Sequence, residues 1–156
     1  MDYLIDTNII VLLSKEGLQF ERFLEDVYRV SIQQDRLLIS VVSVGELNAF
    51  IKKSGLGARR RSFIDRMILQ CITVPINNKN IIDWYGDIDA YSQGKADPVP
   101  FTARNMGKND LWIAATACAY DLPLVTSDDD FPHLDGKFLD LRYVEQELFK
   151  AYLKGQ

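Results

Sequence analysis

Histidine and cysteine are scarce in this sequence of 156 residues, and their scarcity excludes several kinds of chemistry. His133 is the only histidine, so acid–base catalysis by a pair of histidines is excluded. The cysteines, Cys71 and Cys118, lie in segments that read as a strand and a helix, where a thiol is usually a buried apolar group. We therefore expect no structural zinc site, and a reduced, cytoplasmic setting.

Long hydrophobic runs and phosphate-binding glycine motifs are also absent. The longest apolar stretch near the start, Ile9 to Leu13, is far shorter than the roughly 20 residues that a membrane-spanning helix needs. Asp2 and Asp6 precede this stretch, where a signal peptide would be basic. The sequence has neither a Gly-x-Ser-x-Gly elbow nor a Gly-rich phosphate loop. We expect no membrane anchoring and none of the chemistry that these motifs carry.

An excess of positive charge is missing as well. The net charge of −4 argues at first sight against a polyanionic partner, because proteins that bind nucleic acid tend to be basic. The contents of 47% hydrophobic and 26% charged residues are typical of soluble globular proteins. The length predicts a single domain, residues 1–156, since it is too short for two ordinary domains.

Apolar runs and helical periodicity alternate along the chain. Continuous apolar runs predict strands at residues 3–6, 37–42, 71–76, 122–126 and 137–141. Helical spacing predicts helices at residues 9–13, 18–33, 43–53, 58–70, 78–92, 109–120 and 142–153, with residues 94–108 irregular. Apolar strands separated by helices indicate an α/β fold in which helices cover both faces of a parallel sheet.

Acidic residues recur just beyond the predicted strands. Asp6 ends the first strand, and Glu46 lies in the first helical turn after the second. Asp110 opens the helix after the irregular stretch, and Asp128 follows the fourth strand. Because sites in open α/β sheets form beyond the carboxyl ends of the strands, we expect these carboxylates to converge.

Converging carboxylates repel one another unless one stays protonated or a cation is present. A hard divalent ion, Mg²⁺ or Mn²⁺, accepts a ligand set made only of oxygen. An ion held in this way can activate water for attack on a phosphodiester, so the pattern predicts phosphodiester hydrolysis.

Each acid taken alone also has a purely structural explanation. Asp6 or Asn8 could cap the first helix, and Ser43 with Glu46 matches the capping-box pattern. Asp110, at the start of the predicted helix 109–120, would be favoured there by the helix dipole alone. Residues 128–130 could form a solvated turn. Their joint placement at strand ends favours a functional site.

Four blocks of the sequence resemble those of PIN-domain nucleases, in the family's order and over almost the whole chain. They are Asp6-Thr-Asn8, Ser43-Val-Gly-Glu46-Leu, Asn109-Asp110-Leu-Trp-Ile-Ala-Ala and Leu124-Val-Thr-Ser-Asp128-Asp-Asp-Phe131. The branch that looks most similar is the VapC-type toxins of type II toxin–antitoxin pairs. These toxins cleave RNA, often tRNA or rRNA, and are silenced by a cognate antitoxin.

The resemblance implies a PIN-like three-layer α/β/α sandwich with about five parallel strands, and an Mg²⁺- or Mn²⁺-dependent endoribonuclease. It further implies a homodimer with an antitoxin partner. The catalytic, metal-binding acids it implies are Asp6, Glu46, Asp110 and Asp128, with Asp130 as a further metal ligand or as the alternative to Asp128. The residues expected to support them are Thr7, Asn8, Ser43, Asn109 and Thr126.

Basic residues gather on the two helices after the second strand and before Asp110. The RNA-binding candidates are Lys52, Lys53, Arg59, Arg60, Arg61, Arg104 and Lys108. Such a cluster could hold an RNA backbone, and a bound cation would offset the acids, which answers the objection from net charge. An ordinary solvated helix face is the alternative interpretation.

Other functions remain to be separated from RNA cleavage. A receiver-like signalling domain needs an acid pair after the first strand and a lysine after a late strand, where this sequence has Asp6 alone and Ser127. A PIN fold that binds RNA or a partner without catalysis is a second alternative. A PIN nuclease of RNA processing, outside any toxin–antitoxin pair, is a third.

Overall fold

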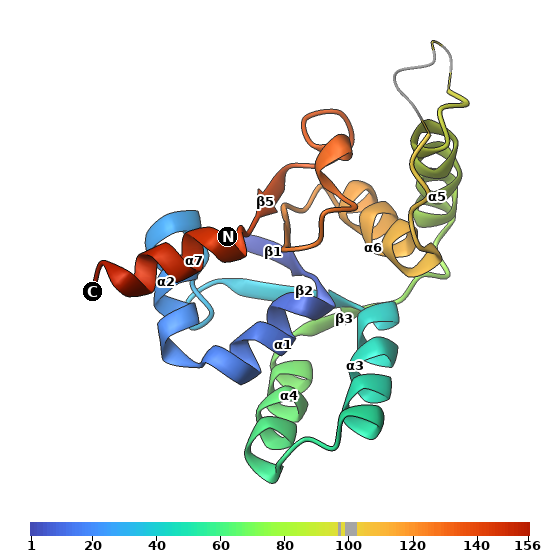
Figure 1. Cartoon of the computed structure of the whole chain (residues 1–156). Coiled ribbons are helices and arrows are strands. Elements are labelled where there is room, and N and C mark those ends of the chain that lie inside the picture. Colours follow the sequence, from blue (N-terminus) through green and yellow to red (C-terminus); the bar gives the residue numbers. More distant parts are fainter. Residues whose placement is uncertain (97, 99–102) are drawn as a thin grey trace.

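The computed structural model describes residues 1–96, 98 and 103–156. Within these residues the centre is a parallel sheet of five strands in the order β3-β2-β1-β4-β5 (Figure 1). The strands are β1 (Asp2–Ile5), β2 (Arg36–Ser40), β3 (Ile72–Val74), β4 (Leu124–Thr126) and β5 (Leu141–Tyr143). The predicted parallel sheet of about five strands is confirmed.

Helices connect and cover these strands. They are α1 (Thr7–Glu16), α2 (Leu18–Tyr28), α3 (Val41–Ser54), α4 (Ala58–Gln70), α5 (Lys79–Ser92), α6 (Lys108–Ala119) and α7 (Gln146–Lys154), with a short 3-10 helix η1 (Pro132–Leu134). No helix in the described ranges is long and apolar enough to cross a membrane.

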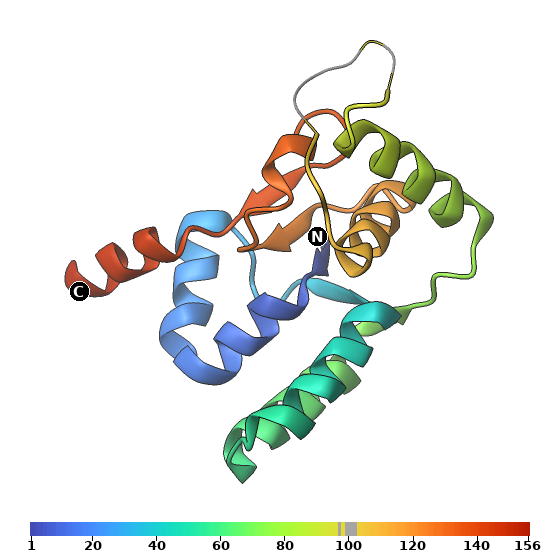
Figure 2. The same ribbon diagram turned by 45° about the vertical axis from the view of Figure 1, so that its right-hand side comes forward.

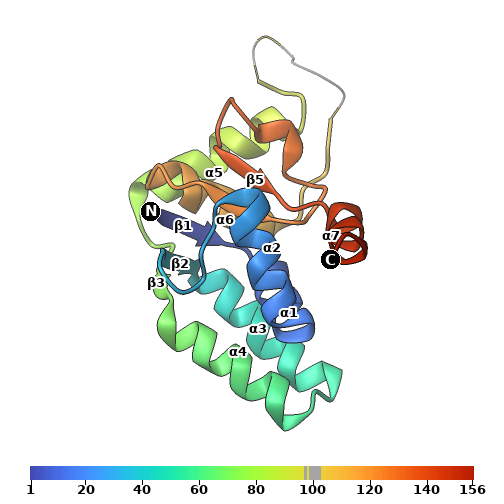
Figure 3. The same cartoon turned by 90° about the vertical axis from the view of Figure 1, so that its left-hand side faces the viewer.

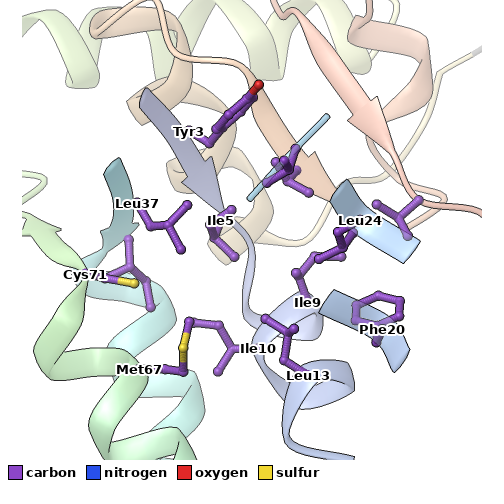
Figure 4. Packing of buried hydrophobic residues seen from close by; sticks show 14 of the residues in the cluster. Tyr3, Ile5, Ile9, Ile10, Leu13, Phe20, Leu24, Leu37, Met67 and Cys71 are labelled. Atoms are coloured by element: carbon purple, nitrogen blue, oxygen red, sulfur yellow. The ribbon is translucent and has the colours of Figure 1, made fainter. Parts of the chain in front are cut away.

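Side chains of β1, β2 and β4 alternate between two hydrophobic clusters, one on each face of the sheet. Tyr3 and Ile5 of β1 belong to one of them (Figure 4), together with side chains of α1, α2, α3, α4 and α7. Figure 3 shows how these helices lie against the sheet. Leu4 belongs to the opposite cluster, which α5 and α6 cover (Figure 2). The predicted three-layer α/β/α sandwich is therefore confirmed.

The strand order creates a switch point between β1 and β4. The chain runs outward from β1 to β2 and β3, and then returns through α5 and α6 to place β4 and β5 on the other side of β1. Connections leave the carboxyl ends of β1 and β4 in opposite directions, which opens the crevice where α/β proteins hold their ligands.

Several predicted boundaries are wrong because local contacts override the apolar pattern. The second helix ends at Tyr28, not at residue 33, since Arg29 adopts a left-handed conformation with φ of 59°. The fifth strand is Leu141–Tyr143, not residues 137–141. The backbone N–H groups of residues 137, 138 and 139 turn back to the Leu134 carbonyl. The last helix accordingly begins at Gln146 instead of Arg142.

Two predicted helix starts are also wrong. The third helix begins at Val41 and is capped by Ser40, whose Oγ accepts a hydrogen bond from Val42 N–H at 3.2 Å, so Ser43 does not open it. The helix that carries Asp110 begins at Lys108 with Gly107 as its N-cap, where Asn109 was expected. Of the irregular stretch 94–108, residues 97 and 99–102 lie outside the described part of the chain.

Candidate active site

Asp6 stands at the point where β1 becomes α1, and the fold leaves its side chain little freedom. It is the N-cap of α1, and its Oδ1 accepts the Thr7 N–H at 2.7 Å. Its Oδ2 accepts the hydroxyl of Thr126, at the end of β4, also at 2.7 Å. The residue is 3% exposed. The capping role and a place in the candidate site therefore coexist in one carboxylate.

Thr126 links Asp6 to the loop that follows β4. Its Oγ1 donates to Asp6 and accepts the Asp128 N–H at 3.0 Å. The Asp130 N–H then donates to Asp128 Oδ1 at 2.9 Å. On the other side of the loop, Asn8 Oδ1 accepts the Ser127 N–H at 3.4 Å. These bonds hold the loop over the carboxyl end of β1.

Asp110, Asp128 and Asp130 form the acidic cluster of the site. Each offers a carboxylate oxygen, and these oxygens lie within 4.8 Å of one another. The Asp129 carboxylate between them instead accepts a hydrogen bond from the Tyr143 hydroxyl. Both residues that the sequence left as alternatives, Asp128 and Asp130, are thus brought to Asp110.

Glu46 extends from α3 to the site, where two uncharged side chains donate hydrogen bonds to its carboxylate. Its Oε1 accepts the Thr7 hydroxyl at 2.7 Å, and its Oε2 accepts the Asn109 amide at 3.3 Å. Among the predicted supporting residues, Thr7 and Asn109 therefore hold this carboxylate. Ser43 does not: its buried Oγ has no hydrogen-bond partner among the described residues.

The close approach of these acids shows in their pKa values. Burial raises the pKa of Asp6 to about 6, against the hydrogen bonds from Thr126 and Thr7. Burial, and then the charges of Asp128, Asp6, Glu46 and Asp130, raise the pKa of Asp110 to about 7. A divalent cation would remove this repulsion, and an all-carboxylate donor set suits the hard ions Mg²⁺ and Mn²⁺. The residues present therefore fit such an ion.

Gly107 is part of the site although the sequence did not single it out. A Cβ atom at this position would lie 3.3 Å from Asp110 Oδ2, closer than ordinary van der Waals contact. The absence of a side chain lets the Asp110 carboxylate lie against the start of its own helix. A glycine three residues before Asp110 is the signal that could have identified it.

Comparison with known families identifies the family of this chain. The PIN-domain profile matches residues 3–137. The chain belongs to the PIN-domain family. The matched range includes Asp6, Glu46, Asp110 and Asp128, and the match confirms the predicted resemblance to the PIN-domain family.

Proteins similar to this PIN domain include a ribonuclease, by sequence, and chains of toxin–antitoxin complexes, by fold. Over 35 residues the chain is 54% identical to Ribonuclease VapC5 of Mycobacterium tuberculosis, a match that spans 22% of this chain and 26% of that protein. The fold is similar to a chain of the VapBC2 structure from Rickettsia felis, with a TM-score of 0.69, 23% identity, and coverage of 93% of this chain and 100% of that one. It is also similar to VapBC-5 from Mycobacterium tuberculosis, a member of a family of toxin–antitoxin systems, with a TM-score of 0.61, 23% identity, and coverage of 92% and 98%.

The basic residues of this PIN domain lie in two separate places. Lys52 and Lys53 end α3 and Arg59–Arg61 begin α4, so they share the tip of the α3–α4 pair, far from the switch point (Figure 1). Arg60 is not wholly available there, since its guanidinium donates to Ser14 Oγ at 3.1 and 3.3 Å. Lys108 begins α6, the helix of Asp110, and it and Arg104 are exposed.

Proposed function

We propose that this PIN domain is a metal-dependent endoribonuclease that hydrolyses RNA phosphodiester bonds at the acidic edge of the sheet. The observation that carries the proposal is the gathering of Asp110, Asp128 and Asp130 within 4.8 Å, beside the buried Asp6. A group of carboxylates whose repulsion raises a pKa is a common mark of a functional site.

Asp110, Asp128 and Asp130 would hold the ion, with Asp6 and Glu46 next to them. When bound, Mg²⁺ or Mn²⁺ supplies the charge that activates water and stabilises the phosphate oxygens. Thr126 and Thr7 keep Asp6 in one orientation, because each of its oxygens accepts one of their hydrogen bonds. Such preorganised carboxylates need no rearrangement when the substrate arrives.

Glu46 is held ready beside the cluster by the hydroxyl of Thr7 and the amide of Asn109. Neither donor carries a charge, so the negative charge of the carboxylate is oriented without being neutralised. Glu46 is therefore suited to accept a proton, at Oε1 or Oε2, from a water molecule near the cluster.

The RNA backbone would be attracted by the exposed basic residues. Lys108, which begins the helix of Asp110, and the exposed Arg104 before it would contact phosphates next to the acids. The basic tip formed by Lys52, Lys53 and Arg59–Arg61 would contact a more distant part of a long or folded RNA.

We further propose that the protein is the toxin of a toxin–antitoxin pair, a homodimer of the cytoplasm in which residues 1–156 form one domain. The support is the similarity to VapBC-5, a toxin–antitoxin system. Adjoining grooves where α1, α2 and α4 meet offer surface for an antitoxin segment. They share Leu18, which is 68% exposed, and Arg59.

RNA cleavage tests the nuclease proposal. The purified protein with Mn²⁺ should cut RNA at discrete positions, and Asp110→Asn should lower the rate on the order of 100-fold or more. Asp129→Asn is the matched control, because this carboxylate bonds to Tyr143 outside the cluster, and it should keep most of the activity. RNA binding without cleavage by the wild type would instead support a PIN fold that only binds.

Growth tests the toxin proposal. Induced expression of the wild type in a bacterial host should arrest growth and create new RNA 5′ ends, while Asp6→Asn should do neither. Cleavage in the test tube without growth arrest would favour a PIN nuclease of RNA processing over a toxin.

A further inference from the structure

A buried polar contact lies where the end of α5 meets η1 and the segment that leads into α6 (Figure 2). Ser92, the last residue of α5, is fully buried. Its Oγ lies 2.8 Å from His133 Nε2 and 3.3 Å from Met106 Sδ. Its carbonyl accepts the Arg104 N–H at 2.6 Å. One serine therefore joins three segments of the chain.

Two of these segments carry acids of the cluster. Asp130 lies just before η1, the short helix of His133, and Asp110 lies in the first turn of α6, just after the buried Met106. The contact made by Ser92 is thus at the base of both segments.

Asp128 and Asp130 differ in how closely they are held to the sheet. Asp128 lies two residues after a buried strand and its N–H is bound to Thr126, whereas Asp130 is exposed and lies farther along the loop. The ring of His133 is also stacked on Tyr91 of α5, with centroids 6.4 Å apart and planes 7° apart. The imidazole is therefore fixed both in its plane and at Nε2.

We infer that His133 is a positioning residue for the metal: its hydrogen bond with Ser92 holds the η1 turn so that Asp130 shares an ion with Asp110 and Asp128. The inference rests on the proposed metal-dependent function. Residues behind metal ligands commonly change metal affinity about 10- to 100-fold when they are replaced.

The Mn²⁺ dissociation constant of the purified protein, measured by calorimetric titration, tests the inference without any RNA. His133→Phe keeps a flat ring against Tyr91 and loses Nε2, and Ser92→Ala removes the other partner. Each should raise the Mn²⁺ dissociation constant about 10-fold. The double variant should be no weaker than the weaker single variant, because both remove the same bond. His133→Gln, which can still reach Ser92 with a polar atom, should recover part of the affinity.

Tyr143→Phe is the matched control, since it removes the hydrogen bond of the same loop at Asp129, outside the cluster. It should leave the dissociation constant within about twofold of the wild type. Wild-type affinity in folded His133→Phe, or equal weakening in Tyr143→Phe, would overturn the inference and leave the proposed function standing. Absence of Mn²⁺ binding by the wild type would overturn both.

Discussion

At the scale of single residues, Asp110 shows how neighbours change the chemistry of one carboxyl group. Its ordinary pKa of 3.8 rises to about 7 because it is partly buried and faces Asp128, Asp6 and Glu46. Without a cation the side chain keeps a proton that an exposed aspartate would lose. A bound cation would therefore relieve the repulsion among these carboxylates and let Asp110 ionise.

The raised pKa of Asp110, caused first by burial and then by the neighbouring acids, predicts how the stability of the metal-free protein depends on pH. The unfolded chain loses the Asp110 proton near pH 3.8, and the folded protein keeps it to about pH 7. Between these values the folded state binds more protons, so the free energy of unfolding falls as the pH rises. Asp6, whose pKa is raised to about 6, acts in the same direction.

Asp110→Asn should therefore stabilise the metal-free protein at about pH 8, by about 1–2 kcal/mol once solvent screening is allowed for. Urea unfolding with a chelator at about pH 5 and pH 8 measures this difference. Asp129→Asn is the control, and its free energy of unfolding should fall between about pH 5 and pH 8 as much as that of the wild type. An equal loss in Asp110→Asn and the wild type would contradict the expected repulsion.

At the scale of elements, the N-cap of α3 lies three residues before the one that the sequence pattern favours. Ser43 and Glu46 have the spacing of a capping box, yet Ser40 caps the helix and Ser43 lies inside it. The displacement frees Glu46 from a capping role. Its carboxylate can then take the hydrogen bonds from Thr7 and Asn109.

Paired alanine substitutions distinguish the two helix starts. Ser40→Ala removes the hydrogen bond to Val42 N–H and should cost about 1 kcal/mol of stability. Ser43→Ala removes a buried hydroxyl that lacks a partner among the described residues, so its cost should stay within about 0.5 kcal/mol. Denaturant unfolding of both variants gives the values, and the reverse order would support a capping box at Ser43.

At the scale of the whole molecule, the last helix closes one face of the sandwich. The family match ends at residue 137, yet β5 pairs with β4 beyond it and α7 packs on α2. The Phe149 ring lies 5.1 Å from both Phe20 and Phe23, measured between centroids. The C-terminal segment therefore belongs to the same hydrophobic core as the strands.

Phe149→Ala should destabilise the protein by about 3 kcal/mol, because it leaves a cavity among buried aromatic rings. The neighbouring Leu148 is 42% exposed, so Leu148→Ala should change stability by no more than about 0.5 kcal/mol. Thermal unfolding compares the two variants. A small effect of Phe149→Ala would show that α7 contributes little to the core.

The sequence by itself determined the layers and the location of the site. Hydrophobic periodicity separates strands from helices, and apolar strands between helices require a covered parallel sheet. Acids placed after strands meet at one edge of such a sheet, which is why Asp6 and Asp128 could be predicted to lie together. Element ends were predicted less well, because turns such as the one at Leu134 depend on hydrogen bonds, not on hydrophobicity.

Only the tertiary structure decided which acids of the loop share the cluster. Three consecutive aspartates in an irregular segment have no periodicity that orients them, so their directions follow from the hydrogen bonds that the folded loop makes. Thr126 Oγ1 accepts the Asp128 N–H, and the Tyr143 hydroxyl binds the Asp129 carboxylate. The contact between Ser92 and His133 likewise joins residues far apart in sequence. Patterns along the chain report local geometry, whereas these contacts exist only after the sheet and its helices have packed.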